Sequence, residues 1–141
     1  MSQAPKQTPE LDDATLAFAE QVFDSARAGD SARLGELLAQ GMPANLRNHA
    51  GDSLLMLASY HGHLQATRTL LEYGADIEGR CEDGKTALMM AAMFNRTEIV
   101  EYLVAHGADP RATDASGATP LAAATMMGAT DTQVQLRGLL G

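Results

Sequence analysis

Residues 81 to 113 read CEDGKTALMMAAMFNRTEIVEYLVAHGADPRAT, and a related stretch occurs 33 residues away on either side. The matching positions carry mostly glycine and alanine. They are Gly51, Gly84 and Gly117, then Ala58, Ala91 and Ala124, and finally Gly41, Gly74 and Gly107. A fixed period of this length is typical of proteins built from stacked structural units, each of which contacts only its neighbours.

The second and third units repeat the same order of local signals. A turn rich in Asp, Asn and Gly leads to a short helix of small residues, and after a Gly or Asn a second, amphipathic helix ends at Gly-Ala-Asp. In the second unit these signals predict helices near residues 53–61 and 64–73. The first unit has a longer first helix and lacks the turn, as expected of an N-terminal cap.

The pattern predicts a single domain over residues 13–141, with units at about 13–47, 48–80, 81–113 and 114–141. Residues 1–12 contain two prolines and no hydrophobic period, so we expect a disordered tail there. An apolar content of 45% and a charged content of 20% are ordinary for a soluble fold. Aromatic residues make up only 4%, which favours thin helices packed through Ala, Leu, Val and Met.

This order of signals resembles the ankyrin repeat, and the resemblance covers roughly residues 15–141. The T-P-L-H-x-A signature of that family corresponds to Ser53–Ala58, Thr86–Ala91 and Thr119–Ala124. The resemblance implies an all-α solenoid of four helix-turn-helix units with β-turn or hairpin-like loops between them. It also implies a noncatalytic scaffold that binds other proteins through its turn tips and the exposed ends of its first helices.

The histidine of that signature is missing from all three copies. Met56, Met89 and Ala122 stand in its place. In ankyrin repeats this histidine helps to tie neighbouring loops together by hydrogen bonds. We therefore expect the polar tie to be lost here and apolar packing by the flexible methionine side chain to replace it.

The fourth unit departs from the period after Gly128. Continuing the count places Arg137 where the earlier units carry an apolar residue. The apolar residues of this segment are instead Val134, Leu136, Leu139 and Leu140. We expect an insertion of about three residues near 129–131, which a C-terminal cap tolerates because no later unit must stack on it.

The charge, the cysteine content and the N-terminal residues indicate which partners and which location to expect. The chain has 10 Lys and Arg against 18 Asp and Glu, a net charge of −8, and this field repels phosphate backbones, so we do not expect nucleic acid to bind. The single cysteine, Cys81, cannot form an internal disulfide. The first residues contain no apolar run of signal-peptide or anchor length, so we expect no membrane association and a cytoplasmic protein.

The resemblance places candidate partner-binding residues in three units. They are Tyr60, His61 and Tyr73 in the second unit, Glu82, Asp83, Lys85, Met93 and Phe94 in the third, and Met126 and Met127 in the fourth. The turn tips in this set are polar and mildly acidic, which favours a basic partner surface. The helix ends, in contrast, are largely apolar.

Six of these candidates form two sets spaced by one period. The first ladder is Tyr60, Met93 and Met126, and the second ladder is His61, Phe94 and Met127. With stacked helices about 8–10 Å apart, three rungs span about 16–20 Å, enough for about three turns of a partner helix or about six residues of a strand. Two interpretations stay open: apolar side chains of a partner insert between the two ladders, or the rungs are buried fillers between the first helices.

No constellation predicts catalysis or a cofactor. His61 and His63 supply only two donors, whereas a metal site needs three or four. The adjacent acids Glu82 and Asp83 are explained by turn chemistry. We therefore expect an adaptor or regulator that binds a partner protein, as a monomer or weak homodimer. The alternative is a structural unit whose groove meets a second copy of the chain, and an enzyme or small-molecule binder ranks third.

Overall fold

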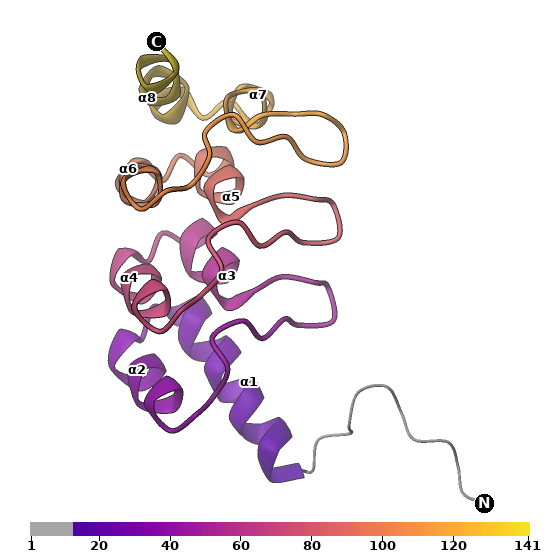
Figure 1. Cartoon of the computed structure of the whole chain (residues 1–141), viewed down its shortest axis with the longest axis vertical. Helices are drawn as coiled ribbons and strands as arrows, with labels where there is room; N and C mark the ends of the chain where they lie inside the picture. The colour runs from indigo at the N-terminus through magenta and orange to yellow at the C-terminus, as the bar shows by residue number, and fades with distance from the viewer. Residues whose placement is uncertain (1–12) are drawn as a thin grey trace, which may run out of the picture.

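A computed structural model describes residues 13–141, and the tail expected over residues 1–12 lies outside them. Within the described residues the chain forms eight α-helices, which follow one another as four pairs (Figure 1). The first helices of the pairs are α1 (Asp13–Ala28), α3 (Leu54–Tyr60), α5 (Ala87–Met93) and α7 (Pro120–Met127). The second helices are α2 (Ser31–Ala39), α4 (Leu64–Glu72), α6 (Thr97–Ala105) and α8 (Thr130–Leu140).

The helices form two rows, and the loops extend from one of them. Figure 1 shows α1, α3, α5 and α7 stacked beside the loops over residues 40–53, 73–86 and 106–119, with the second helices in an outer row. Each first helix packs on the next, and each is also packed against the second helix of its own pair. This is the all-α solenoid that the sequence predicts, and the expected second-unit helices are confirmed as α3 and α4.

The signature serine and threonines start the first helices. The hydroxyl oxygens of Ser53, Thr86 and Thr119 each accept a hydrogen bond from the backbone N–H three residues later, at 3.1, 3.3 and 3.1 Å. Such an N-cap satisfies one of the free N–H groups at a helix start. The spacing of the caps fixes where each loop meets its helix, so the loops come out in register.

Small and unbranched side chains fill the space between the first helices. Ala58, Ala91 and Ala124 are fully buried at equivalent positions, where a larger side chain would force the helices apart. Met56 and Met89 are also fully buried. The expected replacement of the signature histidine by apolar packing is thereby confirmed for these two units.

The fourth unit does not contain the insertion that we expected. Helix α8 begins at Thr130, one period of 33 residues after the start of α6 at Thr97. Gly128 ends α7 in the left-handed conformation, with φ 71°, and Ala129 leads directly into α8. The period therefore runs through the fourth unit, and the expectation of extra residues near 129–131 is wrong.

The error arose from the residues that α8 turns inward. Its buried side chains are Thr132 and Leu136, whereas Val134 is 68% and Leu139 45% exposed. A polar residue occupies one of the two buried positions, and two apolar residues lie on the outer surface. The apolar spacing therefore indicates the buried Leu136 correctly, but it also indicates Val134 and Leu139, which are exposed.

Candidate functional site

The three loops fold into the same tight hairpin, one period apart. The backbone N–H groups of Asn48, Cys81 and Asp114 donate to the carbonyl four residues later, at 3.0, 3.1 and 2.9 Å. The glycine three residues after each of them donates back to its carbonyl at 2.9 Å. Because the helix caps and the hairpins share one period, the turn tips line up along one side of the stack.

One glycine lets neighbouring tips touch. Gly84 has φ 77°, and a Cβ atom at this residue would lie 2.8 Å from the backbone nitrogen of Ala115 in the next loop. The same nitrogen donates a hydrogen bond to the carbonyl of Asp83 at 3.0 Å. A side chain at residue 84 would therefore be strained and would also push the two loops apart.

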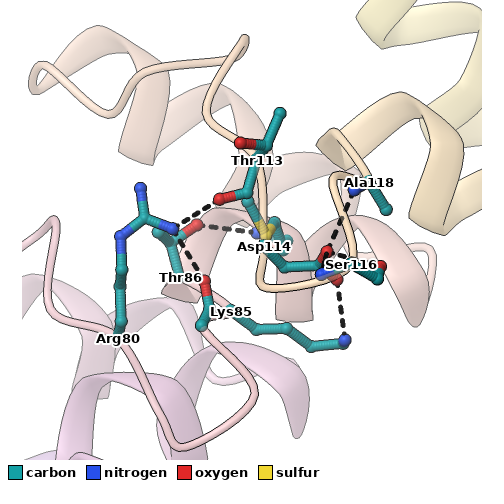
Figure 2. A network of polar contacts seen from close by, with 9 residues as sticks. Arg80, Lys85, Thr86, Thr113, Asp114, Ser116 and Ala118 are labelled. Atoms are coloured by element: carbon teal, nitrogen blue, oxygen red, sulfur yellow. Dashed lines mark hydrogen bonds and ion pairs between the residues drawn. The ribbon is translucent and has the colours of Figure 1, made fainter.

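Two arginines tie neighbouring loops together by hydrogen bonds, so the expected loss of a polar tie between the loops is wrong. Nη1 of Arg47 donates to the carbonyls of Gly51, at 2.7 Å, and Arg80, at 2.6 Å. One period later, Nη1 of Arg80 donates to the carbonyls of Gly84 and Thr113 at the same two distances (Figure 2). Each guanidinium thus joins its own turn to the following unit.

An ion pair connects the second and third loops. Nζ of Lys85 lies 2.9 Å from Oδ2 of Asp114, whose side chain is only 3% exposed. Oδ1 of Asp114 accepts hydrogen bonds from the hydroxyl and N–H of Ser116, at 2.7 and 2.9 Å, and from the N–H of Ala118 at 2.9 Å (Figure 2). All of these partners stabilise the ionised carboxylate.

The titration of this pair argues against acid–base chemistry. The hydrogen bonds from Ser116 and Lys85 hold the pKa of Asp114 well below its usual range. The hydrogen bond to Asp114 raises the pKa of Lys85, so the ammonium keeps its proton at neutral pH. A carboxylate with so low a pKa is a weak general base for Ser116, and a protonated lysine is none. The cluster therefore holds the loops together.

Two pockets lie between the loops and the first helices. The N-terminal pocket has a volume of about 460 Å³ and is lined by Ala19, Glu20, Phe23, Asp24, Arg27, Arg47, Asn48 and His49. The C-terminal pocket has a volume of about 120 Å³ and is lined by Lys85, Met93, Asp114, Ser116, Ala118, Ala123, Met126 and Met127. We call the surface that runs between them, along the ends of the first helices, the groove.

The two pockets occupy equivalent places in the stack. A shift of two periods converts Ala19, Arg27 and Asn48 into Lys85, Met93 and Asp114. Their chemistry differs, because the N-terminal pocket holds two carboxylates and two guanidinium groups, whereas three methionines line the C-terminal pocket. Within the N-terminal pocket, Arg27 and Asp24 form an ion pair at 3.0 Å.

Sequence reasoning missed the N-terminal pocket. The first unit lacks the signature from which positions are transferred, and only Arg27 and Ala28 lie one period before the ladder positions Tyr60 and His61. The available signal was Phe23, an aromatic residue at helical spacing in α1, which is half-buried in the wall of this pocket.

Both ladders become more exposed toward the fourth unit. In the first ladder, Tyr60 and Met93 are half-buried, whereas Met126 is 81% exposed. In the second ladder, His61 is half-buried, Phe94 is 40% exposed and Met127 is 51% exposed. The filler interpretation therefore fits the second unit, whereas the binding interpretation stays a prediction for the fourth. The rungs fill gaps near the second unit and stand open near the fourth.

Aromatic rings pack against one another where the ladders pass from the second unit to the third. The ring of Tyr60 lies 4.2 Å from the ring of His61 and 5.3 Å from the ring of Phe94, measured between centroids. Nε2 of His61 is buried without a hydrogen-bond partner among the described residues. Burial, followed by the nearby charges of His63, Arg27 and Arg96, lowers the pKa of His61, so the ring is neutral at pH 7.

Not all candidate residues lie in the groove. Tyr73 is 46% exposed at the C-cap of α4, in the outer row of helices, and lines neither pocket. Glu82 and Asp83 are exposed at the tip of the loop over residues 73–86, and Lys85 lies in the C-terminal pocket. The structure brings the methionines and Lys85 together and leaves Tyr73 apart from them.

His63 has a structural contact at the link between two helices. Its Nε2 atom lies 2.7 Å from the carbonyl oxygen of Arg27, and one period later Nε of Arg96 donates to the carbonyl of Tyr60 at 3.0 Å. Among residues 13–141, no three His, Cys, Asp or Glu side chains gather closely enough to hold a metal ion. None of the helices in the described part of the chain has both the length and the apolar content needed to cross a bilayer.

The stacked pairs, the aligned hairpins and the open groove define a repeat-protein scaffold. A family model described as ankyrin repeats (3 copies) matches residues 22–114 and 80–136. The chain belongs to the ankyrin repeat family. Members of this family are generally protein-interaction modules and generally noncatalytic.

Two curated proteins are similar to parts of the chain. A Pseudomonas aeruginosa protein named as an ankyrin repeat protein is 60% identical over 68 residues, which cover 48% of this chain and 39% of that protein. An inactive serine/threonine-protein kinase of Mus musculus, TEX14, is 32% identical over 63 residues, which cover 45% of this chain and 4% of that protein. The chain thus matches less than half the length of either relative.

Proposed function

We propose that the chain is a noncatalytic adaptor or regulator that binds a partner protein along the groove. The observation that supports this most directly is the exposure of Met126 and Met127 beside the C-terminal pocket. Apolar side chains left open in a cluster commonly belong to protein interfaces. Methionine also adapts its shape to a partner at little cost. The partner would cover these side chains and fill the pocket.

The charge of the chain supports the same proposal. A net charge of −8 disfavours nucleic acid and anionic membranes, and it speeds encounter with a basic protein surface. A cytoplasmic location fits the single half-buried Cys81, which has no partner for an internal disulfide. We further propose one domain over residues 13–141, with units at about 13–47, 48–80, 81–113 and 114–141.

Site-specific photocrosslinking tests the groove as the binding surface. A photoreactive amino acid replaces Met126 in the groove or, as the control, Glu101, which is exposed on α6 in the outer row. After irradiation of whole cells, we expect a discrete crosslinked partner from residue 126 and none from residue 101. Because Met126 is 81% exposed, the replacement leaves the core untouched.

A second variant separates binding from folding. Phe94→Asp places a charge in the groove and should abolish the crosslink from residue 126, while the melting temperature reports whether the stack survives. Equal crosslinking from residues 101 and 126, or none from residue 126, contradicts the proposal. A crosslink from residue 126 that persists with Phe94→Asp would show that the partner does not depend on the Phe94 side chain and would contradict binding along the whole groove.

Self-association is the second candidate, because the same exposed side chains can meet a second copy of the chain. Sedimentation at two protein concentrations distinguishes the two functions. A dimer that dissociates on dilution and is abolished by Phe94→Asp favours self-association. A monomer at both concentrations, together with a crosslink to a different protein, favours the adaptor.

A further inference from the structure

The C-terminal pocket has the size of one side chain. Its volume of about 120 Å³ is somewhat smaller than the roughly 150 Å³ cavity that accommodates benzene in another protein. Three methionines, Ala118 and Ala123 make up its apolar wall. A single aliphatic side chain, such as leucine or methionine, fits this space and this chemistry.

The polar side of the pocket carries a local excess of negative charge. Lys85 and Asp114 pair with each other at 2.9 Å and cancel. Glu82 and Asp83, at the tip of the same loop as Lys85, are exposed. Neither belongs to any of the three ion pairs found among the described residues. With Arg80, whose guanidinium binds the carbonyl of Gly84 in the same loop, the five groups sum to −1, so a basic group on the partner is favoured beside the pocket.

The position of the acidic tip relative to the pocket is fixed. The carbonyl of Asp83 accepts the hydrogen bond from Ala115, and Gly84 permits this close approach. The acidic tip therefore touches the loop over residues 106–119, which supplies Asp114, Ser116 and Ala118 to the wall of the pocket. One step along the stack of helices is about 8–10 Å, which two to three residues of extended chain cover at about 3.3 Å each.

From these three features we propose that the groove takes an extended partner segment with an aliphatic side chain and a basic side chain two or three residues apart. The aliphatic side chain fills the C-terminal pocket, and the basic side chain meets Glu82 and Asp83. A spacing of two also places both side chains on the same face of a strand. This inference rests on the proposed function and specifies the chemistry of the partner.

A series of peptides tests the spacing. Each labelled peptide carries one leucine in a Gly/Ser background and one arginine placed one to five residues before or after it. Fluorescence anisotropy with the full chain measures binding. We expect the tightest binding at a separation of two or three residues on one side of the leucine. A best separation of four residues would indicate a helix and would overturn the proposal, as would no dependence on separation or no binding by any peptide at about 1 mM.

Matched variants of the chain assign the two contacts. Removing both tip carboxylates, by Glu82→Gln with Asp83→Asn, should weaken the best peptide about three- to tenfold and should leave the same peptide without arginine unchanged. The control removes two exposed carboxylates of the outer row, by Glu98→Gln with Glu101→Gln, and should have no effect. Equal losses of peptide affinity in the two double variants would show that only the net charge of the chain matters, and would overturn the acidic contact.

The pocket contact has its own variant and control. Met126→Gln should weaken the leucine peptide and have no effect on a peptide in which glycine replaces leucine. Unchanged binding of the leucine peptide would overturn the pocket contact. The photocrosslinking experiment distinguishes failure of this inference from failure of the proposed function. A crosslinked partner at residue 126 combined with failure of the peptide series defeats only the present inference, whereas the absence of that crosslink defeats the proposed function itself.

Discussion

Helices α6 and α8 start one period apart at equivalent positions, yet different interactions hold them. Helix α6 buries Ile99, Val100 and Leu103, whereas α8 buries only Thr132 and Leu136. The position of Ile99 is taken by Thr132, and the position of Val100 by the half-buried Gln133. The same spacing therefore produces the same placement with much less apolar burial.

Hydrogen bonds to the third unit take the place of that burial. The hydroxyl of Thr132 donates to the carbonyl of Ala92 at 2.7 Å, and its N–H donates to Oδ1 of Asn95 at 3.0 Å. Nε2 of Gln135 donates to the carbonyl of Thr97 at 2.8 Å. A hydrogen bond contributes about 0.5–1.5 kcal/mol net, whereas burying an aliphatic side chain contributes about 1.5–3 kcal/mol. Repeat spacing therefore determines where a helix lies, and residue type determines how much free energy holds it on the stack.

The largest expected effect comes from the one leucine that both helices bury. Leu103 and Leu136 are both 0% exposed at equivalent positions. Leu103→Ala should cost about 2–5 kcal/mol and lower the stability of the whole stack, because α6 is covered on both sides by other units. Leu136→Ala should cost less and release α8 before the rest unfolds. Urea unfolding measures the first effect, and hydrogen exchange of the α8 amides measures the second.

The two leucine variants also test whether α8 is held more weakly than α6. Equal losses of stability, with every helix exchanging its amides at one common rate, would mean that α8 belongs to the same cooperative core as α6. In that case hydrogen bonding would hold a terminal helix as firmly as apolar burial does.

A smaller effect is expected from the buried hydroxyl of α8. Thr132→Val keeps the shape of the side chain and removes its hydrogen bond to the carbonyl of Ala92. We expect the free energy of opening α8 to fall by about 1 kcal/mol. The amides of α8 should exchange faster, and those of the other helices should exchange at unchanged rates. Thr130→Val, at the exposed first residue of the same helix, is the matched control. A stabilised Thr132→Val variant would show that apolar contact at this position outweighs the hydrogen bond.

The smallest effect concerns the ion pair that joins the loops before α5 and α7. Asn48 occupies the position equivalent to Asp114 and accepts the same two turn hydrogen bonds, from Ala50 and Asp52 at 3.0 Å. Asp114→Asn should therefore keep the turn and lose only the attraction to Lys85. We expect a slightly lower Tm than that of the unaltered chain at pH 7.

The sign of the pH dependence follows from the two pKa shifts. The lowered pKa of Asp114 means that its contribution is present above the ordinary value of 3.8 and is lost as the pH falls below it. The raised pKa of Lys85 means that its contribution is present below 10.5 and is lost at higher pH. The difference in Tm should thus be largest between these values and shrink at both ends. A difference independent of pH would refute the charge contribution.

Much of the fold was predictable because it depends on short-range chemistry repeated at a fixed interval. The N-cap at Thr86, the small residue at Ala91 and the chain reversal at Gly107 each have a local physical cause, and their recurrence predicts stacking. The placement of α8 was predictable from the same count. The apolar spacing of this segment conflicts with the period because a polar residue, Thr132, occupies a buried position. Thr132 can be buried there because its hydroxyl has a hydrogen-bond partner.

The site was less predictable than the fold. The period of Arg47 and Arg80 is visible in the sequence, but which carbonyls their side chains reach depends on the separation of the loops. The exposure of a rung depends in the same way on its neighbours. Phe94 is partly covered because the ring of Tyr60 lies against it, whereas Met126 has no such neighbour among the described residues. These contacts exist only once the units are stacked.

The arginine ties have a consequence for how such a chain changes in length during evolution. The acceptors at Arg80 and Thr113 are main-chain oxygens, so the side chain of the accepting residue is free to vary. A tandem duplication of residues 48–80 would carry its own guanidinium, at Arg80, and would find a ready acceptor in the segment that follows it. The gene can therefore gain a copy without a second, compensating mutation at the new junction.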